Sequence, residues 1–326
     1  MRRLLLAVLA LSLTAAPAAA RPANGLDVTS WVLPSSPSRV VANNAGGLTT
    51  LAVSATMLRA SGHAVTPVNG DMLRLARAGR AHHLATELAL SNYSNPLEAF
   101  DAGALHRLLS DPGAIRKVVA AVAHQVARGP WDGVNVDFEL VRASDGAGLT
   151  RFVAQLQSAM PRSKTVSIDI SASGTVAIYR HRGYRLGLLR RHVDVVDLMA
   201  YDYSGPTWTG PGPIGPLDWQ RRSVEALLRA VPASKVQLGV AGYGYTWPAN
   251  GTGTSVTDRQ ARRLVADDSA TPTWMPDEGE WTATLSDGTV LWWSDARSYD
   301  LRVTLAQQLH LRGTAVWRLG SSDRLA

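Results

Sequence analysis

The chain has 326 residues, a net charge of +7 and no cysteine. The lack of cysteine excludes a lipoprotein anchored through that residue and a small module held together by disulfides, so packing alone has to stabilise the chain. The positive charge is mild and its arginines are scattered, which argues against a nucleic-acid-binding protein. A solvated arginine-rich surface explains this charge, and attraction to an anionic cell wall is the alternative.

The N-terminus has the pattern of a secretory signal peptide. Two arginines at positions 2 and 3 precede an apolar stretch from Leu4 to Leu13, and three alanines follow at 18–20. The apolar stretch is shorter than the ~20 residues that a membrane-spanning helix needs, so a cleaved signal is favoured over an uncleaved anchor. We therefore expect a signal peptide at 1–20 and a secreted protein at 21–326, with no membrane span after cleavage.

Short aliphatic segments alternate with longer amphipathic ones through most of the sequence. This alternation is typical of repeated βα units around a parallel sheet. Eight segments are candidate strands, namely Leu26–Leu33, Leu48–Ser54, His83–Leu90, Gly133–Glu139, Thr165–Ile170, Val195–Tyr201, Val236–Val240 and Gly313–Trp317. Four have apolar residues at helical spacing, namely Ile115–Arg128, Leu149–Met160, Arg221–Ala230 and Leu301–Leu311. The predicted fold is an α/β protein, a (β/α)8 TIM barrel.

The interval between the seventh and eighth candidate strands is about seventy residues long, far more than a βα loop needs. Within it, Val256–Val265 has a helical pattern. The segments Glu280–Leu285 and Thr289–Trp293 flank Ser286-Asp287-Gly288 and predict a hairpin. We therefore expect a small α+β insertion at about 246–294.

The fourth candidate strand carries the strongest signal for chemistry. Side chains alternate between the two faces of a strand, so Asn135, Asp137 and Glu139 point one way and the apolar residues between them point the other. In a parallel barrel the polar set faces the interior, and the strand leads to the end where such enzymes place their active sites. Buried carboxylates are rarely kept without a partner or a task, although a satisfied polar network in the core is the alternative.

The spacing of the two acids also constrains the mechanism. Asp137 and Glu139 lie roughly 6.5 Å apart along one strand, so both approach a substrate from the same side. A retaining glycosidase with a protein nucleophile needs two carboxylates that flank the sugar. If the substrate carries a 2-acetamido group, its carbonyl oxygen can attack the anomeric carbon instead. Glu139 would then protonate the leaving oxygen and Asp137 would stabilise the positive oxazolinium ring.

At this point the sequence resembles glycoside hydrolase family 18, the chitinase family, whose fourth strand carries Asp-x-x-Asp-x-Asp-x-Glu. With Asn135 in place of the middle aspartate, the chain is similar to the branch that contains bacterial spore-cortex-lytic N-acetylglucosaminidases. The resemblance extends from about Leu26 to Asp323. Its motifs are Asp132–Glu139, Leu198–Tyr203 (LMAYDY), Leu238–Tyr245 (LGVAGYGY) and Gly313–Gly320 (GTAVWRLG).

The resemblance implies roles for further residues. Tyr201 would hydrogen-bond the acetamido carbonyl, Asp202 would hold the acetamido group or a neighbouring hydroxyl, and Trp317 would form the apolar floor of the cleavage subsite. Tyr201 as a core tyrosine is the alternative. Asn135 and Tyr243 are expected to contribute to substrate binding.

Three further expectations concern neighbouring residues. Asp132, out of phase with the inward set, is expected to anchor the start of its strand. The neutral amide of Asn135 is expected to hydrogen-bond Asp137 and leave it ionised over a wider pH range than a second aspartate would. The candidates for a cleft wall, with ordinary packing as the alternative for each, are Trp208, Trp247, Trp292 and Trp293.

The sequence therefore predicts a secreted glycoside hydrolase that cleaves β-linked N-acetylglucosamine polymers, either peptidoglycan or chitin-like, by a substrate-assisted retaining reaction. A non-catalytic, lectin-like barrel is the alternative, and it is disfavoured because Glu139, Asp137 and Tyr201 are all present. The histidines show no metal-ligand spacing, so we expect no metal and no cofactor. The expected partner is the polysaccharide, bound by a monomer.

Overall fold

The computed structural model describes residues 25–325, and the expected signal peptide at 1–20 lies outside them. Eight parallel strands form a closed barrel in the order β1-β15-β9-β8-β7-β6-β3-β2. They are β1 (Asp27–Val32), β2 (Thr50–Met57), β3 (Ala85–Ser91), β6 (Gly133–Asp137), β7 (Thr165–Ser171), β8 (Val195–Met199), β9 (Val236–Ala241) and β15 (Gly313–Trp317). The predicted TIM barrel is therefore confirmed, and every predicted strand matches an observed one.

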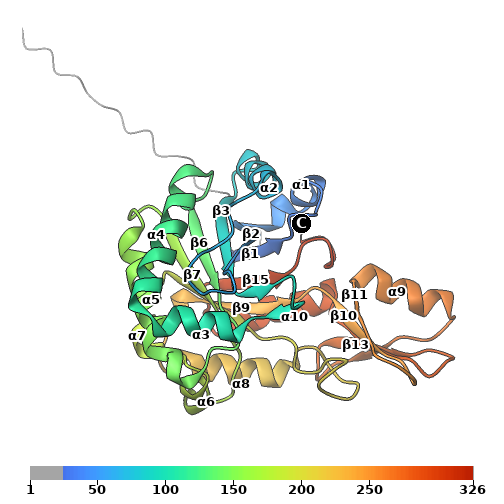
Figure 1. Cartoon of the computed structure of the whole chain (residues 1–326). Coiled ribbons are helices and arrows are strands. Elements are labelled where there is room, and N and C mark those ends of the chain that lie inside the picture. The colour runs from blue at the N-terminus through green and yellow to red at the C-terminus, as the bar shows by residue number, and fades with distance from the viewer. Residues whose placement is uncertain (1–24, 326) are drawn as a thin grey trace, which may run out of the picture.

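Helices surround the barrel and cover the outer faces of its strands (Figure 1). They are α1 (Arg39–Asn44), α2 (Gly70–Ala81), α3 (Ala102–Ser110), α4 (Pro112–Arg128), α5 (Gly146–Ala159), α6 (Val176–His181), α7 (Leu186–Leu189), α8 (Leu217–Leu228) and α10 (Ala296–Gln308). Short 3-10 turns occupy Ala45–Gly47, Ala143–Asp145 and Ala233–Lys235. The four predicted helices correspond to α4, α5, α8 and α10.

Local sequence explains where α4 begins. The Asp111 side chain accepts a hydrogen bond from the Gly113 amide at 2.7 Å, and Pro112 occupies the first turn. This capping aspartate satisfies an amide that has no partner within the helix, and proline there loses no hydrogen bond. The buried face of α4, which includes Ile115, Val118 and Val122, packs in the layer between helices and strands.

The insertion projects from one side of the barrel between β9 and β15 (Figure 1). It is an antiparallel five-stranded sheet in the order β11-β10-β14-β13-β12, with one helix. Its elements are β10 (Gly244–Trp247), β11 (Ser255–Val256), α9 (Asp258–Asp267), β12 (Thr273–Met275), β13 (Glu280–Thr284) and β14 (Val290–Trp293). The predicted α+β insertion is confirmed, but its sheet has three strands more than the predicted hairpin.

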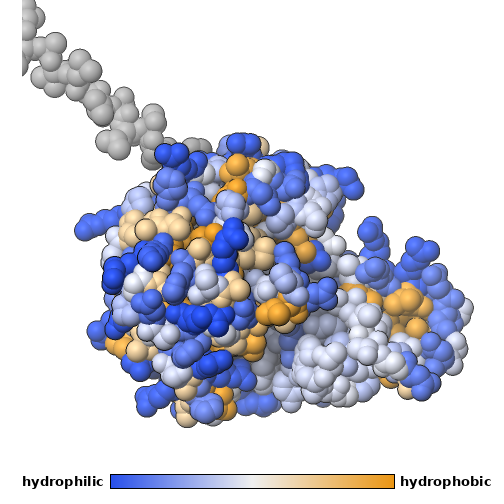
Figure 2. All heavy atoms as spheres, viewed as in Figure 1, coloured by the Kyte–Doolittle hydropathy of each residue, from blue (hydrophilic) through white to orange (hydrophobic). Residues whose placement is uncertain are grey.

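A separate small core holds the insertion together, built on Val256, Ala261, Val265, Leu291 and Trp293. A two-stranded ribbon, β4 (Tyr93–Ser94) with β5 (Ala99–Phe100), follows β3. On the molecular surface, hydrophobic residues appear in separate patches among hydrophilic ones (Figure 2). No helix within residues 25–325 is long and apolar enough to cross a membrane.

Candidate active site

Strand β6 directs polar and apolar side chains to opposite faces, as its sequence predicts. Asn135 is fully buried inside the barrel, and Val134 and Val136 are fully buried in the layer under the helices. Phe138 follows the same outward direction and packs against Phe152 of α5, with ring centroids 5.2 Å apart. The strand itself ends at Asp137, so the predicted strand is two residues too long and Glu139 lies just beyond its carboxyl end.

A buried asparagine holds Glu139 in place. The Asn92 side chain accepts a hydrogen bond from the Glu139 amide at 2.8 Å and donates one to the Glu139 carbonyl at 3.0 Å. Asn92 directly follows β3 and is completely buried. Both bonds are to the main chain, so they fix the position of Glu139 and leave its carboxyl group free. Sequence reasoning missed Asn92, because a lone asparagine after a strand carries no recognisable motif.

The electrostatic surroundings favour a protonated Glu139. Burial and the nearby charges of Asp137 and Asp202 raise the pKa of Glu139 to about 8. Burial also raises the pKa of Asp137 to about 6, and a hydrogen bond from Ser91 opposes this shift. Because the two carboxylates repel each other, the first proton lost from the pair leaves the second more tightly held. At neutral pH the pair therefore has a proton-donating glutamic acid beside an aspartate.

The expected hydrogen bond between the Asn135 amide and Asp137 is wrong, because Asn135 has other partners. The Asn135 carbonyl oxygen accepts a hydrogen bond from the Trp31 indole at 3.1 Å. Its amide nitrogen donates to Asp169 at 2.7 Å and to Ser167 at 3.1 Å, and no hydrogen bond to Asp137 is seen. The hydrogen-bonding groups of the Asn135 side chain are therefore satisfied inside the barrel, and Asn135 does not face the cleft.

The aspartate that faces Asp137 comes from the next strand. Asp169 lies on β7, and burial together with the Asp137 charge raises the pKa of Asp169 well above its usual range. The Asp137 charge thus favours the protonated form of Asp169 on the neighbouring strand. The alternating pattern of the segment Thr165–Ser171 could have revealed Asp169 as an inward-facing acid.

Two tyrosines orient Asp202, which follows β8. The hydroxyl of Tyr243 donates to Asp202 Oδ1, and the hydroxyl of Tyr245 donates to the same oxygen at 2.8 Å. Asp202 has a φ of 58°, in the left-handed region that non-glycine residues rarely adopt. Burial of its carboxylate raises the pKa of Asp202, and the two hydrogen bonds act in the opposite direction. The structure thus groups Asp202 with Tyr243, and it adds Tyr245, which was not predicted.

Tyr201 lies beside this group, with its ring centroid 6.3 Å from that of Tyr243. Burial is the largest cause of a pKa far above the usual range, so the Tyr201 hydroxyl remains a hydrogen-bond donor. Trp317 ends β15 and contacts the same aromatic cluster, and its ring lies 6.0 Å from that of Trp31. The predicted acids, tyrosines and Trp317 therefore lie at the carboxyl ends of the barrel strands, whereas Asn135 lies deeper in the barrel.

The four tryptophans proposed for a cleft wall separate into two kinds. Trp208 is 52% exposed and meets the edge of Tyr245 at 5.8 Å, so it can contact a ligand. Trp293 is 2% exposed and stacks on Trp281 within the insertion, and Trp247 is also buried. Trp292 packs against the cluster of Tyr243 and Trp317.

Asp132 anchors the start of β6, as expected, since its Oδ1 accepts a hydrogen bond from Nη1 of Arg80 at 2.8 Å.

A pocket of about 440 Å³ opens at this end of the barrel. The residues that line it include Glu139, Tyr201, Asp202, Tyr203, Trp219 and Arg182. It therefore brings together three of the predicted site residues, whereas Trp317 and Tyr243 lie in the adjoining aromatic cluster. Within residues 25–325, no group of three or more histidine, aspartate or glutamate side chains is arranged to hold a metal ion.

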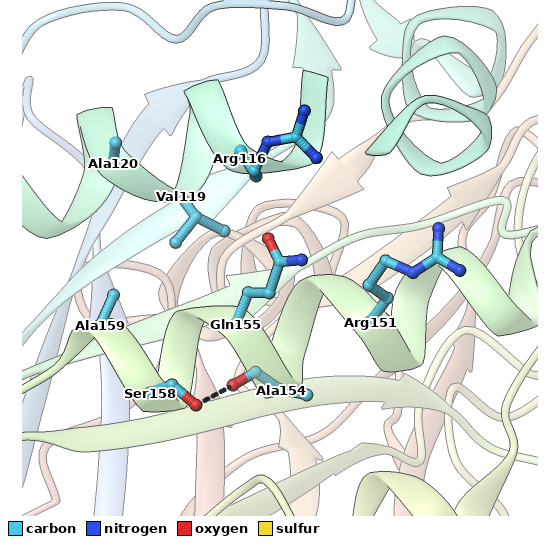
Figure 3. A pocket seen from close by; sticks show the side chains of 8 residues that line it. All are labelled: Arg116, Val119, Ala120, Arg151, Ala154, Gln155, Ser158 and Ala159. Carbon is cyan, nitrogen blue, oxygen red and sulfur yellow. Dashed lines mark hydrogen bonds between the residues drawn. The ribbon is translucent and has the colours of Figure 1, made fainter. Parts of the chain in front are cut away.

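A second hollow, of about 480 Å³, lies on the outside of the barrel between α4 and α5 (Figure 3). The helices face each other through Val119 and several alanines, with Arg116, Arg151 and Gln155 along the groove. The only hydrogen bond drawn there is local, from the Ser158 hydroxyl to the Ala154 carbonyl at 2.9 Å. This groove has no carboxylate among its lining residues and is not a candidate for acid-base chemistry.

Comparison with known proteins finds similar sequences and structures among a glycosylase, a cortical fragment-lytic enzyme and a chitinase. The chain is 24% identical over 250 residues to YvbX, an uncharacterised glycosylase of Bacillus subtilis (strain 168), covering 74% of this chain and 72% of the relative. It is 26% identical over 249 residues to the cortical fragment-lytic enzyme of the same organism, covering 72% of this chain and 57% of that enzyme. The crystal structure of a chitinase from Chromobacterium violaceum matches with a TM-score of 0.82 and 25% identity, covering 92% of this chain and 96% of the chitinase.

The sequence profile of the glycosyl hydrolases family 18 matches residues 76–322, about three quarters of the chain. This stretch includes β6 with its two acids, the segment after β8 that holds Asp202, and the insertion. The resemblance of the four strand-end motifs is thereby confirmed. The chain belongs to glycosyl hydrolase family 18, a family of glycosidases.

Proposed function

We propose that this glycosidase is exported and cleaves β-linked N-acetylglucosamine in peptidoglycan or chitin-like polymers, with the substrate's own acetamido group as nucleophile. The observation that carries the proposal is Glu139, a carboxyl group with a pKa of about 8 that faces a pocket beside Asp137 and Tyr201. A raised pKa keeps a general acid protonated at neutral pH, where it can donate its proton.

In the proposed reaction, Glu139 gives its proton to the glycosidic oxygen as the bond from that oxygen to the anomeric carbon breaks. The acetamido carbonyl oxygen attacks the anomeric carbon from the opposite face and forms an oxazolinium ring. Asp137 stabilises the positive charge of that ring, and the Tyr201 hydroxyl orients the acetamido group. Water then opens the ring with Glu139 as base, so the anomeric configuration is retained.

The alternative protein nucleophile would be Asp202, which also lines the pocket. Its Oδ1 already accepts hydrogen bonds from Tyr243 and Tyr245, which lowers the nucleophilicity of the carboxylate. Asp137 lies two residues from Glu139 in the chain and approaches the substrate from the same side. Both facts favour a nucleophile supplied by the substrate.

The names of the relatives support N-acetylglucosamine glycans as the substrate class, since one is a cortical fragment-lytic enzyme and another a chitinase. The chain spans 57% of the length of the former, so its substrate is proposed rather than transferred. Export, the signal peptide at 1–20 and the catalytic unit at 21–326 are supported by the charged and apolar pattern of the N-terminus. N-terminal sequencing of the secreted protein tests the cleavage site.

Glu139→Gln is the primary test of the proposed activity. The variant lacks the transferable proton, so turnover of a chromogenic β-N-acetylglucosaminide and of purified peptidoglycan should fall by about 10³-fold or more. Glu225→Gln, an exposed glutamate on α8, is the matched control and should retain full activity. If wild type and Glu139→Gln bind these glycans equally and neither cleaves them, the protein is a lectin-like barrel and the proposal fails.

The participation of the acetamido group has its own test. A substrate with a 2-hydroxyl in place of the 2-acetamido group should be cleaved at a negligible rate, and proton NMR of the first product should show the retained anomer. Cleavage of the hydroxyl analogue at a comparable rate, or an inverted product, would exclude substrate assistance.

A further inference from the structure

The pocket beside Glu139 has a cationic wall that the proposed reaction does not use. Arg182 lines this pocket, and its Nη1 donates to the Ala172 carbonyl at 2.9 Å. Ala172 directly follows β7, so this hydrogen bond holds the guanidinium at the carboxyl end of that strand. Arg182 is exposed and makes no ion pair with any residue in the described part of the chain. Its remaining N–H groups can therefore bind a ligand.

A second polar group on the same wall is the Ser173 hydroxyl. Ser173 is 4% exposed, lines the pocket, and its hydroxyl has no hydrogen-bond partner within residues 25–325. The Ser173 amide donates to the Tyr179 hydroxyl at 3.2 Å, which fixes the main chain there. Buried hydroxyl groups are nearly always hydrogen-bonded in folded proteins. The Ser173 hydroxyl thus has a hydrogen bond to give that no described residue accepts.

Aromatic side chains form another part of the pocket lining. Tyr203 is 50% exposed, and its ring centroid lies 5.3 Å from that of Trp219. Exposed aromatic rings of this kind stack on the C–H faces of sugars. The pocket therefore combines a surface suited to a sugar ring with a guanidinium and a hydroxyl that are suited to a charged substituent.

The charges around the pocket indicate which substituent fits. Among the described residues that line it, Glu139 and Asp202 are acidic and Arg182 is the only basic residue. Without Arg182, a negatively charged sugar would be repelled by Asp202 and by the acid itself. Arginine binds carboxylates through two parallel hydrogen bonds, a geometry that a neutral hydroxyl cannot match.

We propose that the part of this pocket lined by Arg182, Ser173 and Tyr203 is the subsite for the leaving-side sugar, whereas Tyr201 keeps its role towards the acetamido group of the other sugar. This subsite selects a sugar carrying a carboxylate, which Arg182 binds together with the Ser173 hydroxyl. This inference rests on the proposed function, because Glu139 donates its proton to the leaving sugar and so places that sugar on its own side of the cleft. Trp317, the expected floor of the cleavage subsite, does not line this pocket. The substrate class is then peptidoglycan rather than neutral chitin. Its muramic acid carries a lactyl group that ends in a free carboxylate where the stem peptide is absent, and in an amide to a peptide with its own carboxylates where the peptide is present.

A neighbouring groove extends the positive potential. It has a volume of about 1040 Å³ and is lined by Arg180, Arg185, Arg190 and Arg191 with no acidic residue among its described lining residues. Such a cluster attracts polyanionic chains over distances of about one Debye length, roughly 10 Å at moderate salt. Because Arg180 belongs to this groove and not to the pocket, it provides a control for general attraction.

The test measures binding, so that it does not depend on turnover. In a Glu139→Gln background, isothermal titration calorimetry compares N-acetylglucosaminyl-β-1,4-N-acetylmuramic acid with the same disaccharide reduced to the lactyl alcohol. We expect the carboxylate form to bind about tenfold more tightly. Adding Arg182→Gln should abolish this preference, Arg182→Lys should restore part of it, and adding Arg180→Gln should leave it intact.

A third ligand, in which the lactyl group carries an amide-linked L-alanine, distinguishes two sources of the carboxylate. Loss of the preference with this ligand assigns recognition to the lactyl group, and its retention assigns recognition to the first carboxylate of the peptide stem. The inference is overturned if the parent variant shows no preference, if Arg182→Gln keeps it, or if Arg180→Gln removes it equally. Unfolding curves of the variants show whether a loss of the carboxylate preference reflects unfolding. If Arg182→Gln does not fold, the preference measured for Arg182→Lys decides between the two outcomes.

Turnover by the wild type separates this inference from the proposed function. If the wild type cleaves neutral chitooligosaccharides and no carboxylate preference exists, the leaving-side inference is wrong and the proposed function stands. If the carboxylate preference is found but no glycan is cleaved, the proposed function is wrong and the Arg182 subsite stands as a binding site.

Discussion

The carboxyl groups of Glu139 and Asp137 influence each other's ionisation, and the pH dependence of activity should reflect the pKa values of both. Activity needs Glu139 protonated and Asp137 ionised. With pKa values of about 8 and about 6, activity should fall as the pH rises through about 8 and as it falls through about 6. A bell-shaped profile of kcat/KM against pH is therefore expected.

Replacing Asp137 separates the two residues. Asp137→Asn removes a negative charge that raises the pKa of Glu139, so the alkaline limb of the profile should move to lower pH. The rate at the optimum should also fall by about a hundredfold, since the charge that stabilises the oxazolinium ring is lost. An alkaline limb that stays in place would contradict the coupling between the two carboxylates.

The individual site residues could be predicted to different extents. The sequence predicts Glu139 and Asp137 as site residues, because the alternation of side chains along one strand places both on one face. Asp169 follows the same rule on β7, but no motif draws attention to a single aspartate among aliphatic residues. Asn92 and Arg182 come from other parts of the chain, and the pairing of β6 with its neighbours β3 and β7 brings them beside Glu139.

Among the elements, the insertion depends on a buried ion pair. Arg302 of α10 and Glu280 of β13 are each 1% exposed and lie 3.3 Å apart. Glu280 accepts hydrogen bonds from the Ile214 and Gly215 amides at 2.7 and 2.9 Å, and Arg302 donates to the Gln220 side chain of α8. The pair thus ties the insertion to two barrel helices and to the loop after β8.

Arg302→Met should destabilise the fold by about 3–5 kcal/mol, because it leaves the Glu280 carboxylate buried without its counterion. Arg222→Met is the control, since Arg222 pairs with Asp218 on the exposed surface of α8 and should contribute less than about 1 kcal/mol. Urea unfolding measures both. Equal losses in the two variants would mean that burial of the pair has no special effect.

The elements of the barrel were largely predictable, since each strand is a short aliphatic run and each boundary was within three residues of the observed one. The strands of the insertion were less predictable from the sequence. β12 has only three residues, Thr273–Met275, and its pairing with β13 depends on a partner distant in sequence. Periodicity needs a longer segment to distinguish a strand from a loop.

On the scale of the whole molecule, the interior of the barrel contains several buried acidic residues. Glu87, Asp169 and Asp197 are all buried within it, and burial raises the pKa of each carboxyl group. For Glu87 the value rises from 4.5 to about 7. Because the folded state holds this proton more tightly than the unfolded chain, stability is greatest below pH 4.5 for this group and is lost as the pH rises towards 7.

Glu87→Gln should remove that loss. The variant should be more stable than the wild type at pH 8, by up to about 3 kcal/mol, and nearly equal to it at pH 4.5. The amide oxygen can still accept the hydrogen bond that Ser167 donates at 2.7 Å. Chemical unfolding at the two pH values measures the difference, with Glu225→Gln as the surface control. A gain of the same size at both pH values would rule out proton linkage as its cause.

The last described residues cross the seam between the first and last barrel strands. Arg324 donates to the Asn43 carbonyl at 2.9 Å, and the Leu325 amide donates to the Asn44 side chain at 3.0 Å. Leu325 lies so close to Gly47 that a Cβ on that glycine would come within 1.7 Å of the Leu325 carbonyl oxygen. Any side chain at position 47 would therefore push the main chain of Leu325 away and break the hydrogen bonds that hold residues 324 and 325 against α1, so this position has to remain glycine.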